Sequence, residues 1–381
     1  MSTVKATNFQ NASSAIANMV TDTGGNVSFG GTAAMSSSFL RNRIINGNMV
    51  IDQRNAGVEV NPAVNQTYYL DRWIAISSAA SKFKIGQNAG AVTPPTGYTS
   101  YLGLTSLSAY TVGTGEVFAV RHQIEGLNVS DLAWGTASAA TVTLSFWVRS
   151  SLTGTFGGSV RNSDSDRSYP FTYTISVANT WEQKTVTIAG DTSGTWLTTN
   201  GIGISLTFSL GASSTVSGTA GAWAAASYAS ATGAVSVVGT SGATFYVTGV
   251  QLEVGTVATP FERQIFSNQL AQCQRYFIST RNSSQFGQVL TTGQAVSTSR
   301  IVFGGVQFPV VMRADPTLTV YSATADTSGA VVLYNATSSA VGSTFAVAAV
   351  NQQGFYNRVD GSASLTAASF YSFSYVASAE L

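Results

Sequence analysis

Charged side chains are scarce in this 381-residue chain, and their scarcity limits what the protein can bind. Asp, Glu, Lys and Arg together make up 9% of the residues, whereas roughly a quarter is usual in soluble domains. The formal net charge is +1 and the basic residues form no runs, so no cationic stripe is available to neutralise nucleic-acid phosphates. We therefore expect no nucleic-acid partner. With 44% apolar residues, the low charge indicates a folded chain rather than a disordered one.

Cysteine and histidine are rarer still, with one residue of each. The single thiol, Cys273, permits neither an intrachain disulfide nor a paired-cysteine redox or metal motif, and we expect no cofactor and no metal site. His122 alternates with Phe118, Val120 and Ile124, which predicts a buried histidine rather than a general base. The sequence contains no GxSxG, HExxH, Walker or GxGxxG motif, so no catalytic residue is predicted.

Long apolar runs are missing as well. No window approaches 18 consecutive apolar residues, so we expect no membrane insertion. The N-terminal residues lack the charged and apolar regions of a secretion signal, and a cytoplasmic product is expected. Residues 1–41 are small and polar, and Asp22 to Val27 reads as a glycine turn between two strands. Because such a segment cannot bury a core, we expect it to pack on a neighbouring protein; a disordered leader is the alternative.

Alternation of apolar and polar residues is the main pattern that the chain does show. Strand-like runs recur about every ten residues from Tyr68 to Val254, with turn residues between them and no helical pattern. This arrangement favours a β-sandwich or jelly roll. The clearest runs begin at Val142, Tyr169 and Ile202. Further strands are expected at residues 300–313, 317–322, 344–350 and 370–376.

The stretch from Thr244 to Phe277 changes from strand to helix periodicity and is predicted to join two domains. Thr259, Pro260 and Glu262 have the spacing of a capping box, with proline at the first helical position. Behind them, apolar residues recur at helical spacing and predict one buried stripe: Phe266, Leu270, Cys273 and Phe277. Cys273 is therefore expected to be a buried structural thiol.

Several blocks of the sequence resemble motifs of bacteriophage tail-fibre and related virion proteins. The blocks are Asn46-Gly47-Asn48 with Gln53-Arg54, Asp71-Arg72-Trp73, the run Thr248-Gly249-Val250-Gln251-Leu252-Glu253, the run Thr259-Pro260-Phe261-Glu262, the run Cys273-Gln274-Arg275-Tyr276-Phe277, the run Phe308 to Arg313, and the C-terminal Ala379-Glu380-Leu381. Asp52 and Asn55 stand where that family commonly has Trp and Gly. We expect Asp71 and Arg72 to form an ion pair at the start of a strand, beside a buried Trp73.

The resemblance covers about residues 42–381 and implies an all-β protein, a jelly-roll β-sandwich followed by a short helix and a second C-terminal β-domain. The implied organisation is an extended virion-docking segment (1–41), a jelly-roll domain similar to carbohydrate-binding modules (42–258), a linker helix (259–280) and a C-terminal β-domain (281–381). It also implies a homotrimer that binds other tail or baseplate proteins through its N-terminus. Such a protein would be synthesised in the host cytoplasm and would reside in the virion tail.

The expected function is non-enzymatic attachment to a host-surface saccharide through weak, multivalent contacts. Trp196, Trp223 and Tyr228 lie near Gly/Ser/Ala-rich loops and are candidates for stacking on sugar faces, although core packing is an equal alternative for each. Two other functions stay open, a purely architectural collar, baseplate or spike component and a polysaccharide depolymerase. A depolymerase would need two carboxylates about 5–10 Å apart. The best acidic cluster, Asn162 to Asp166, reads more simply as a polar hairpin tip.

Overall fold

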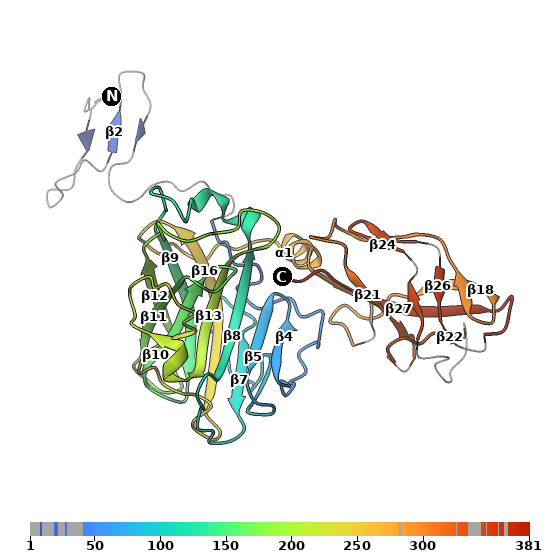
Figure 1. Ribbon diagram of the computed structural model, residues 1–381, viewed down its shortest axis with the longest axis horizontal. Helices are drawn as coiled ribbons and strands as arrows, with labels where there is room; N and C mark the ends of the chain where they lie inside the picture. The colour runs from blue at the N-terminus through green and yellow to red at the C-terminus, as the bar shows by residue number, and fades with distance from the viewer. Residues whose placement is uncertain are drawn as a thin grey trace, which may run out of the picture.

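A computed structural model of the chain shows two β-structured bodies, with helix α1 and the C-terminal end between them (Figure 1). The structure describes residues 8–9, 19–21, 27–28, 41–281, 283–324, 326–333, 344–347, 349–356, 358–361 and 365–381. Near the N-terminus, three short antiparallel strands are described: β1 (Asn8–Phe9), β2 (Met19–Thr21) and β3 (Val27–Ser28). The strands β2 and β3 flank the predicted glycine turn, which itself lies outside the described residues. Most of residues 1–41, for which a docking role was predicted, also lie outside the described residues.

Within the described residues, the first body is a sandwich of two antiparallel sheets. One sheet has six strands in the order β11-β10-β13-β8-β5-β4, and the other has five in the order β12-β9-β16-β7-β6. The strands are β4 (Asn65–Leu70), β5 (Trp73–Ser77), β6 (Phe83–Gln87), β7 (Leu102–Ser106), β8 (Val117–Glu125), β9 (Val142–Ser150), β10 (Gly154–Arg161), β11 (Ser168–Ile175), β12 (Glu182–Ile188), β13 (Ile202–Ala212) and β16 (Thr244–Val254). The chain passes repeatedly between the sheets, which confirms the predicted jelly-roll sandwich.

The connections of the sandwich contain short elements only. They are η1 (Gly126–Asn128), η2 (Ser130–Leu132), η3 (Ser214–Val216), β14 (Ser217–Gly218) and β15 (Ser230–Ala231). The last two strands pair with each other in parallel, and β15 packs against β10, β11 and β13.

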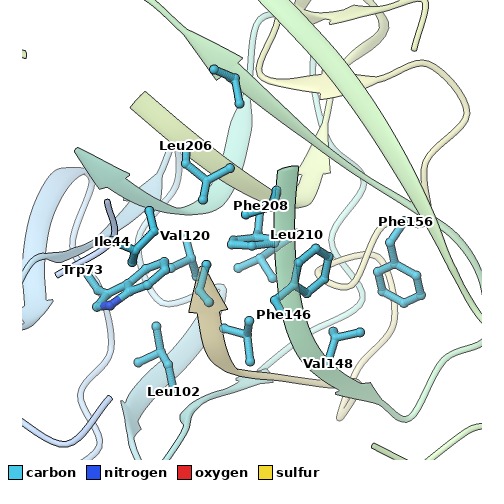
Figure 2. Close-up of a cluster of buried hydrophobic side chains, with 14 of the residues drawn as sticks. Ile44, Trp73, Leu102, Val120, Phe146, Val148, Phe156, Leu206, Phe208 and Leu210 are labelled. Atoms are coloured by element: carbon cyan, nitrogen blue, oxygen red, sulfur yellow. The ribbon is translucent and has the colours of Figure 1, made fainter. Parts of the chain in front are cut away.

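The core of the sandwich lies between its two sheets. Figure 2 shows side chains of both sheets pointing toward one another, among them Phe208 of β13 and Phe146 of β9, whose ring centroids are 4.9 Å apart. Burial of such rings contributes about 2–3 kcal/mol each. His122 lies fully buried in this body, with its ring centroid 5.0 Å from that of Trp73. The predicted burial of both residues is confirmed.

Helix α1 (Phe266–Gln274) begins later than the capping-box pattern predicted. Its N-cap is Ile265, which makes no side-chain capping bond. Thr259 instead donates its N–H and its hydroxyl to Glu253, and Glu262 accepts a backbone N–H from the sandwich at 2.6 Å. Because these groups are already bonded to the sandwich, they cannot satisfy the helix N-terminus. The prediction of a capping box was therefore wrong.

The predicted apolar stripe of the helix is only partly buried. Cys273 is buried as expected and Leu270 is half-buried, but Phe266 is 51% exposed. Phe277 lies beyond the helix in β17 (Phe277–Ser279), where it pairs with Ser378. The helix is short because the chain enters this strand three residues after its last helical residue.

The second body has its own hydrophobic core, separate from that of the sandwich. Its larger sheet is built around β27 (Phe370–Ser378), which pairs with β17, β18, β21 and β22. The other described strands are β18 (Thr291–Ser297), β19 (Arg300–Val302), β20 (Val306–Gln307), β21 (Thr317–Ser322), β22 (Val332–Leu333), β23 (Ala346–Val347), β24 (Val350–Asn351), β25 (Gly354–Phe355) and β26 (Arg358–Asp360). The predicted strands at 317–322 and 370–376 are confirmed, whereas those at 300–313 and 344–350 are each divided into two short strands.

Candidate functional site

The structure brings two of the three predicted glycan-binding aromatics together beside the start of β11. Trp196 and Trp223 are half-buried, with ring centroids 5.4 Å apart. Both pack edge to face on the buried Trp134, at 4.7 and 5.3 Å. The indole N–H of Trp223 donates to the carbonyl oxygen of Ala189 at 2.7 Å. The two tryptophans therefore contribute to packing while keeping part of their surface exposed.

The third aromatic, Tyr228, lies on the same loop as Trp223 and is also half-buried. Its backbone N–H donates to the hydroxyl of Ser168 at 3.3 Å. The hydroxyl of the adjacent Ser227 accepts a hydrogen bond from Arg161 Nη1 at 3.2 Å. The loop of residues 223–228 thus runs alongside β10 and β11, with an aromatic residue at each end. We name it the aromatic loop.

The loop that carries Trp196 is held by a bidentate ion pair. Nε and Nη2 of Arg167 each donate to a carboxylate oxygen of Asp191 at 2.8 Å. Asp191 is buried, and its carbonyl oxygen accepts the backbone N–H of Gly135 at 2.7 Å. A surface that is held in place in this way loses little conformational entropy on binding a ligand.

Most residues of the tail-fibre-like blocks lie elsewhere, at the joint between the two bodies. The side-chain amide of Gln53 donates to Asp71 Oδ1 at 2.7 Å and to the carbonyl oxygen of Phe277 at 2.9 Å. The backbone N–H of Gln53 donates to Asp71 Oδ2 at 2.7 Å. Burial raises the pKa of Asp71 to about 7. Asp71 therefore orients the glutamine that connects the sandwich to β17.

The predicted ion pair between Asp71 and Arg72 does not form. Both carboxylate oxygens of Asp71 are engaged by Gln53, and Arg72 binds Glu380 near the C-terminus instead. The guanidinium carbon of Arg72 also lies 3.6 Å from the centre of the Tyr276 ring. Figure 1 shows the C-terminal end beside α1, between the two bodies. An unpaired buried charge is costly, and Glu380 supplies the counter-charge for Arg72.

A second buried carboxylate, Glu125, holds the end of α1 against the sandwich. Arg275 donates to its two oxygens at 3.0 and 2.6 Å, and the Tyr276 hydroxyl donates at 2.6 Å. Burial opposes ionisation of Glu125, but these hydrogen bonds outweigh burial and lower its pKa. Arg313 adds hydrogen bonds to the carbonyl oxygens of Ala379 and Glu380. The joint is thus a network of paired charges.

The asparagine-glycine block braces the N-terminal loop of the sandwich. The side-chain amide of Asn46 donates to the carbonyl oxygen of Asp71 at 3.0 Å, and the indole of Trp73 donates to the Asn46 carbonyl at 3.0 Å. The Gly47 carbonyl accepts the backbone N–H of Val250 at 2.9 Å. A Cβ at Gly47 would lie 2.1 Å from the Val250 carbonyl oxygen, so only glycine permits this approach. The neighbouring Asn48 is half-buried.

The end of β16 forms a polar cluster with the segment that precedes α1. The side chain of Gln251 donates to Glu253 at 2.8 Å and accepts the backbone N–H of Glu262 at 2.7 Å. The carbonyl oxygen of Pro260 accepts a hydrogen bond from Arg41 Nη2 at 2.9 Å. These residues therefore hold the linker on the sandwich.

His122 and Cys273 are both placed inside the protein. Nε2 of His122 lies 3.0 Å from the Ile45 carbonyl oxygen, and burial lowers the pKa of this imidazole well below its usual value. Burial raises the pKa of the Cys273 thiol. Residues 162–167 form the tip between β10 and β11, as predicted. In the described part of the chain, no group of three or more His, Cys, Asp or Glu side chains could hold a metal ion. None of its helices has the length and apolar character to cross a membrane.

Two arginines on the outer face of the six-stranded sheet were not predicted from the sequence. Arg121 and Arg161 are both buried and lie on strands β8 and β10, which flank β13. In β8 the signal was present, since Arg121 is out of phase with Phe118, Val120 and His122. Arg121 and Arg161 lie on one face because both of their strands pair with β13. No local sequence pattern encodes this pairing.

Comparisons with known proteins bear on the fold of the sandwich. No family model matches the chain, and no curated protein matches it. The similar solved structures include the enzymatically active domain of tailspike protein 4 from bacteriophage CBA120, at 11% identity and a TM-score of 0.29, covering 57% of this chain and 22% of that one. They also include a putative sugar-binding protein from Bacteroides thetaiotaomicron, at 12% identity and a TM-score of 0.32, covering 56% of this chain and 99% of that one.

A third similar structure is a family 11 carbohydrate-binding module from Clostridium thermocellum in complex with a mixed-linked tetrasaccharide, at 12% identity and a TM-score of 0.26. The match covers 52% of this chain and 100% of the module. The chain spans about a fifth of the tailspike's length. At these TM-scores, the assignment of the first body as a jelly-roll sandwich rests on its own strand order and pairing.

Proposed function

We propose that the protein is a non-enzymatic component of a bacteriophage tail fibre and attaches to a saccharide on the host surface. The observation that carries the proposal is the joint. Blocks that separately resemble tail-fibre proteins meet there in one buried network, and Arg72 and Glu380 in that network are 308 residues apart in sequence. These residues are distant in sequence but form one structural unit. They therefore support one resemblance that extends over the chain, rather than several unrelated short matches.

The aromatic loop supports the saccharide as the ligand. Trp223 and Tyr228 are half-buried at its two ends, and Trp196 packs beside Trp223. Partly exposed aromatic rings offer apolar faces to the C–H groups of a sugar, and each such contact is weak. Several copies on one particle would convert weak contacts into tight attachment through effective concentration.

Adsorption of particles to host cells tests this function. Tyr228→Ala is expected to slow adsorption at least tenfold, because the loss at one site is multiplied over the copies that bind together. Tyr356→Ala, at an aromatic residue that is 50% exposed in the second body, is the matched control and should adsorb normally. Trp196→Ala and Trp223→Ala should slow adsorption as well, and their melting temperatures must be measured alongside because both residues pack on Trp134.

Two outcomes would favour the other functions. Particles that lack residues 68–381, and that assemble and still adsorb normally, would identify the protein as an architectural component of the collar, baseplate or spike. Shortened oligosaccharides released from host polysaccharide by the purified protein would identify a depolymerase. Neither outcome is expected.

A homotrimer is the expected assembly of the purified protein. Charged residues are 9% of the chain, so little electrostatic repulsion opposes association. Fibres that the chain resembles are usually trimeric, and residues 1–41 are too polar to bury a core of their own. Mass photometry should report three times the monomer mass of 39.6 kDa. A stable monomer at micromolar concentration would contradict this prediction.

A further inference from the structure

The outer face of the six-stranded sheet carries a cluster of buried polar residues on β8, β13 and β10. Val120, Leu206 and Val160 of these strands face the core, so by alternation their neighbours face outward. The strand register places Arg121 opposite Thr207, and Arg161 opposite Ser205. We name as the outer-face cluster the residues Arg121, Ser159, Arg161, Ser205, Thr207 and Ser209.

The two arginines of the outer-face cluster are buried, and neither has a carboxylate partner among the described residues. Arg121 is 8% exposed and Arg161 is 6% exposed. Nη1 of Arg121 donates to the side-chain oxygen of Gln66 at 2.6 Å, and Nη1 of Arg161 donates to the hydroxyl of Ser227 at 3.2 Å. Both acceptors are neutral. The cluster therefore holds two positive charges and no negative one.

This arrangement differs from that of the other buried arginine among the described residues. Arg72 is paired with the carboxylate of Glu380. Half-buried arginines follow the same rule at Arg167, which binds Asp191, and at Arg275, which binds Glu125. In these three cases a carboxylate offsets the cost of removing the guanidinium from water. The half-buried Arg149 and Arg313, by contrast, have no ion pair among the described residues.

Other groups of the outer-face cluster are also left without partners. Arg161 Nε and the hydroxyls of Ser159 and Ser209 are buried and make no hydrogen bond within the described residues. Burial lowers the pKa of Arg161, and burial together with the charge of Arg161 lowers the pKa of Arg121 to about 9. A bound anion would supply the missing counter-charge and the missing acceptors.

We propose that the outer-face cluster binds the anionic group of a host-surface saccharide, a carboxylate or a phosphate. This inference rests on the proposed function and assigns the class of saccharide to it. The planar guanidinium donates two parallel hydrogen bonds to either kind of anion. The aromatic loop borders the cluster, because Ser227, the neighbour of Tyr228, contacts Arg161.

The experiment measures binding of the full-length protein to an array of bacterial surface polysaccharides. Each acidic polysaccharide stands beside its own neutral form, prepared by carboxyl reduction or by removal of phosphate. The wild type is expected to bind at least one acidic polysaccharide and to lose at least tenfold in affinity for its neutral form. Loss of binding after carboxyl reduction would identify a carboxylate as the ligand group, and loss of binding after removal of phosphate would identify a phosphate.

Substitutions then assign the binding to the outer-face cluster. Arg121→Gln and Arg161→Gln should each weaken binding of the acidic polysaccharide at least tenfold. Arg149→Gln is the matched control, since Arg149 projects from the five-stranded sheet and no ion pair is found for it among the described residues. The first two variants remove unpaired buried charges, so their melting temperatures without ligand should not fall. Arg161→Lys keeps the charge and removes the guanidinium fork, so an intermediate loss of binding affinity is expected. This variant provides the test if Arg161→Gln does not fold.

Three results would overturn the inference, and they differ in what they say of the proposed function. Equal binding to acidic polysaccharides and to their neutral forms would overturn the anionic ligand and leave saccharide attachment intact. Inorganic phosphate or acetate that competes as strongly as the acidic polysaccharide would mean an adventitious ion only. Binding to no polysaccharide of the array would overturn both the inference and the proposed function.

Discussion

Replacement of Glu380 by Gln is expected to destabilise the protein by about 3–5 kcal/mol, because it leaves buried arginines without their counter-charge. Glu380 is the shared carboxylate partner of Arg54 and Arg72, and all three side chains are largely removed from water. Gln keeps one acceptor oxygen but no charge. Both guanidinium groups would therefore face each other across a neutral amide at the joint.

Chemical denaturation followed by tryptophan fluorescence measures the change, with calorimetry to show whether the two bodies then unfold separately. The matched control is Asp360→Asn. Its arginine partners Arg300 and Arg358 are each 45% exposed, so a loss of about 1 kcal/mol or less is expected. Equal effects of the two substitutions would contradict a buried charge network at the joint.

A second expected result is a pH dependence that belongs to Asp71. The pKa of this buried carboxyl is raised to about 7, whereas in the unfolded chain it is about 4. Between these values the folded protein holds a proton that the unfolded chain has released. The contribution of Asp71 to stability is therefore fully present below about pH 4 and is lost as the pH rises through 7, by about 4 kcal/mol in total.

The measurement compares the unfolding free energy of the wild type with that of Asp71→Asn from pH 2 to 8. As the pH rises from 4 to 8, the wild type should lose several kcal/mol of unfolding free energy relative to Asp71→Asn. Asp326→Asn is a control of opposite sign, because the hydrogen bonds from Arg281 lower the pKa of Asp326. Its contribution is present at neutral pH and is lost as the pH falls through its lowered pKa. A difference for Asp71→Asn that does not change with pH would show that this carboxyl is ionised in the folded protein.

The joint gives these two predictions a functional meaning. Glu380 and Asp71 act on the same contact, one by neutralising Arg72 and the other by orienting Gln53 toward Phe277. Under the function proposed above, the fibre bears load along its chain when it meets a cell surface, and the joint would transmit that load between the described bodies. Loosening of the joint should therefore reduce adsorption even when the outer-face cluster is intact.

The sequence by itself determined which segments become strands and which residues are buried in them. The runs that begin at Val142, Tyr169 and Ile202 became β9, β11 and β13, because an extended backbone places alternate side chains on opposite faces. The same alternation predicted the burial of His122, and the helical spacing of apolar residues predicted that of Cys273. Local periodicity is a property of a few neighbouring residues, so it is available without any knowledge of the fold.

The partners of the polar residues were decided only by the tertiary structure. Thr259 and Glu262 match a capping box, but they bond to sandwich residues that lie beside them in space, so α1 begins at Phe266. Arg72 adjoins Asp71 in sequence, yet it binds Glu380. Hydrogen bonds and ion pairs form with whichever group the folded chain brings within about 3 Å, and strand pairing between distant segments sets that group. For the same reason, the meeting of Arg121 and Arg161 on one face follows from the pairing of β8 and β10 with β13.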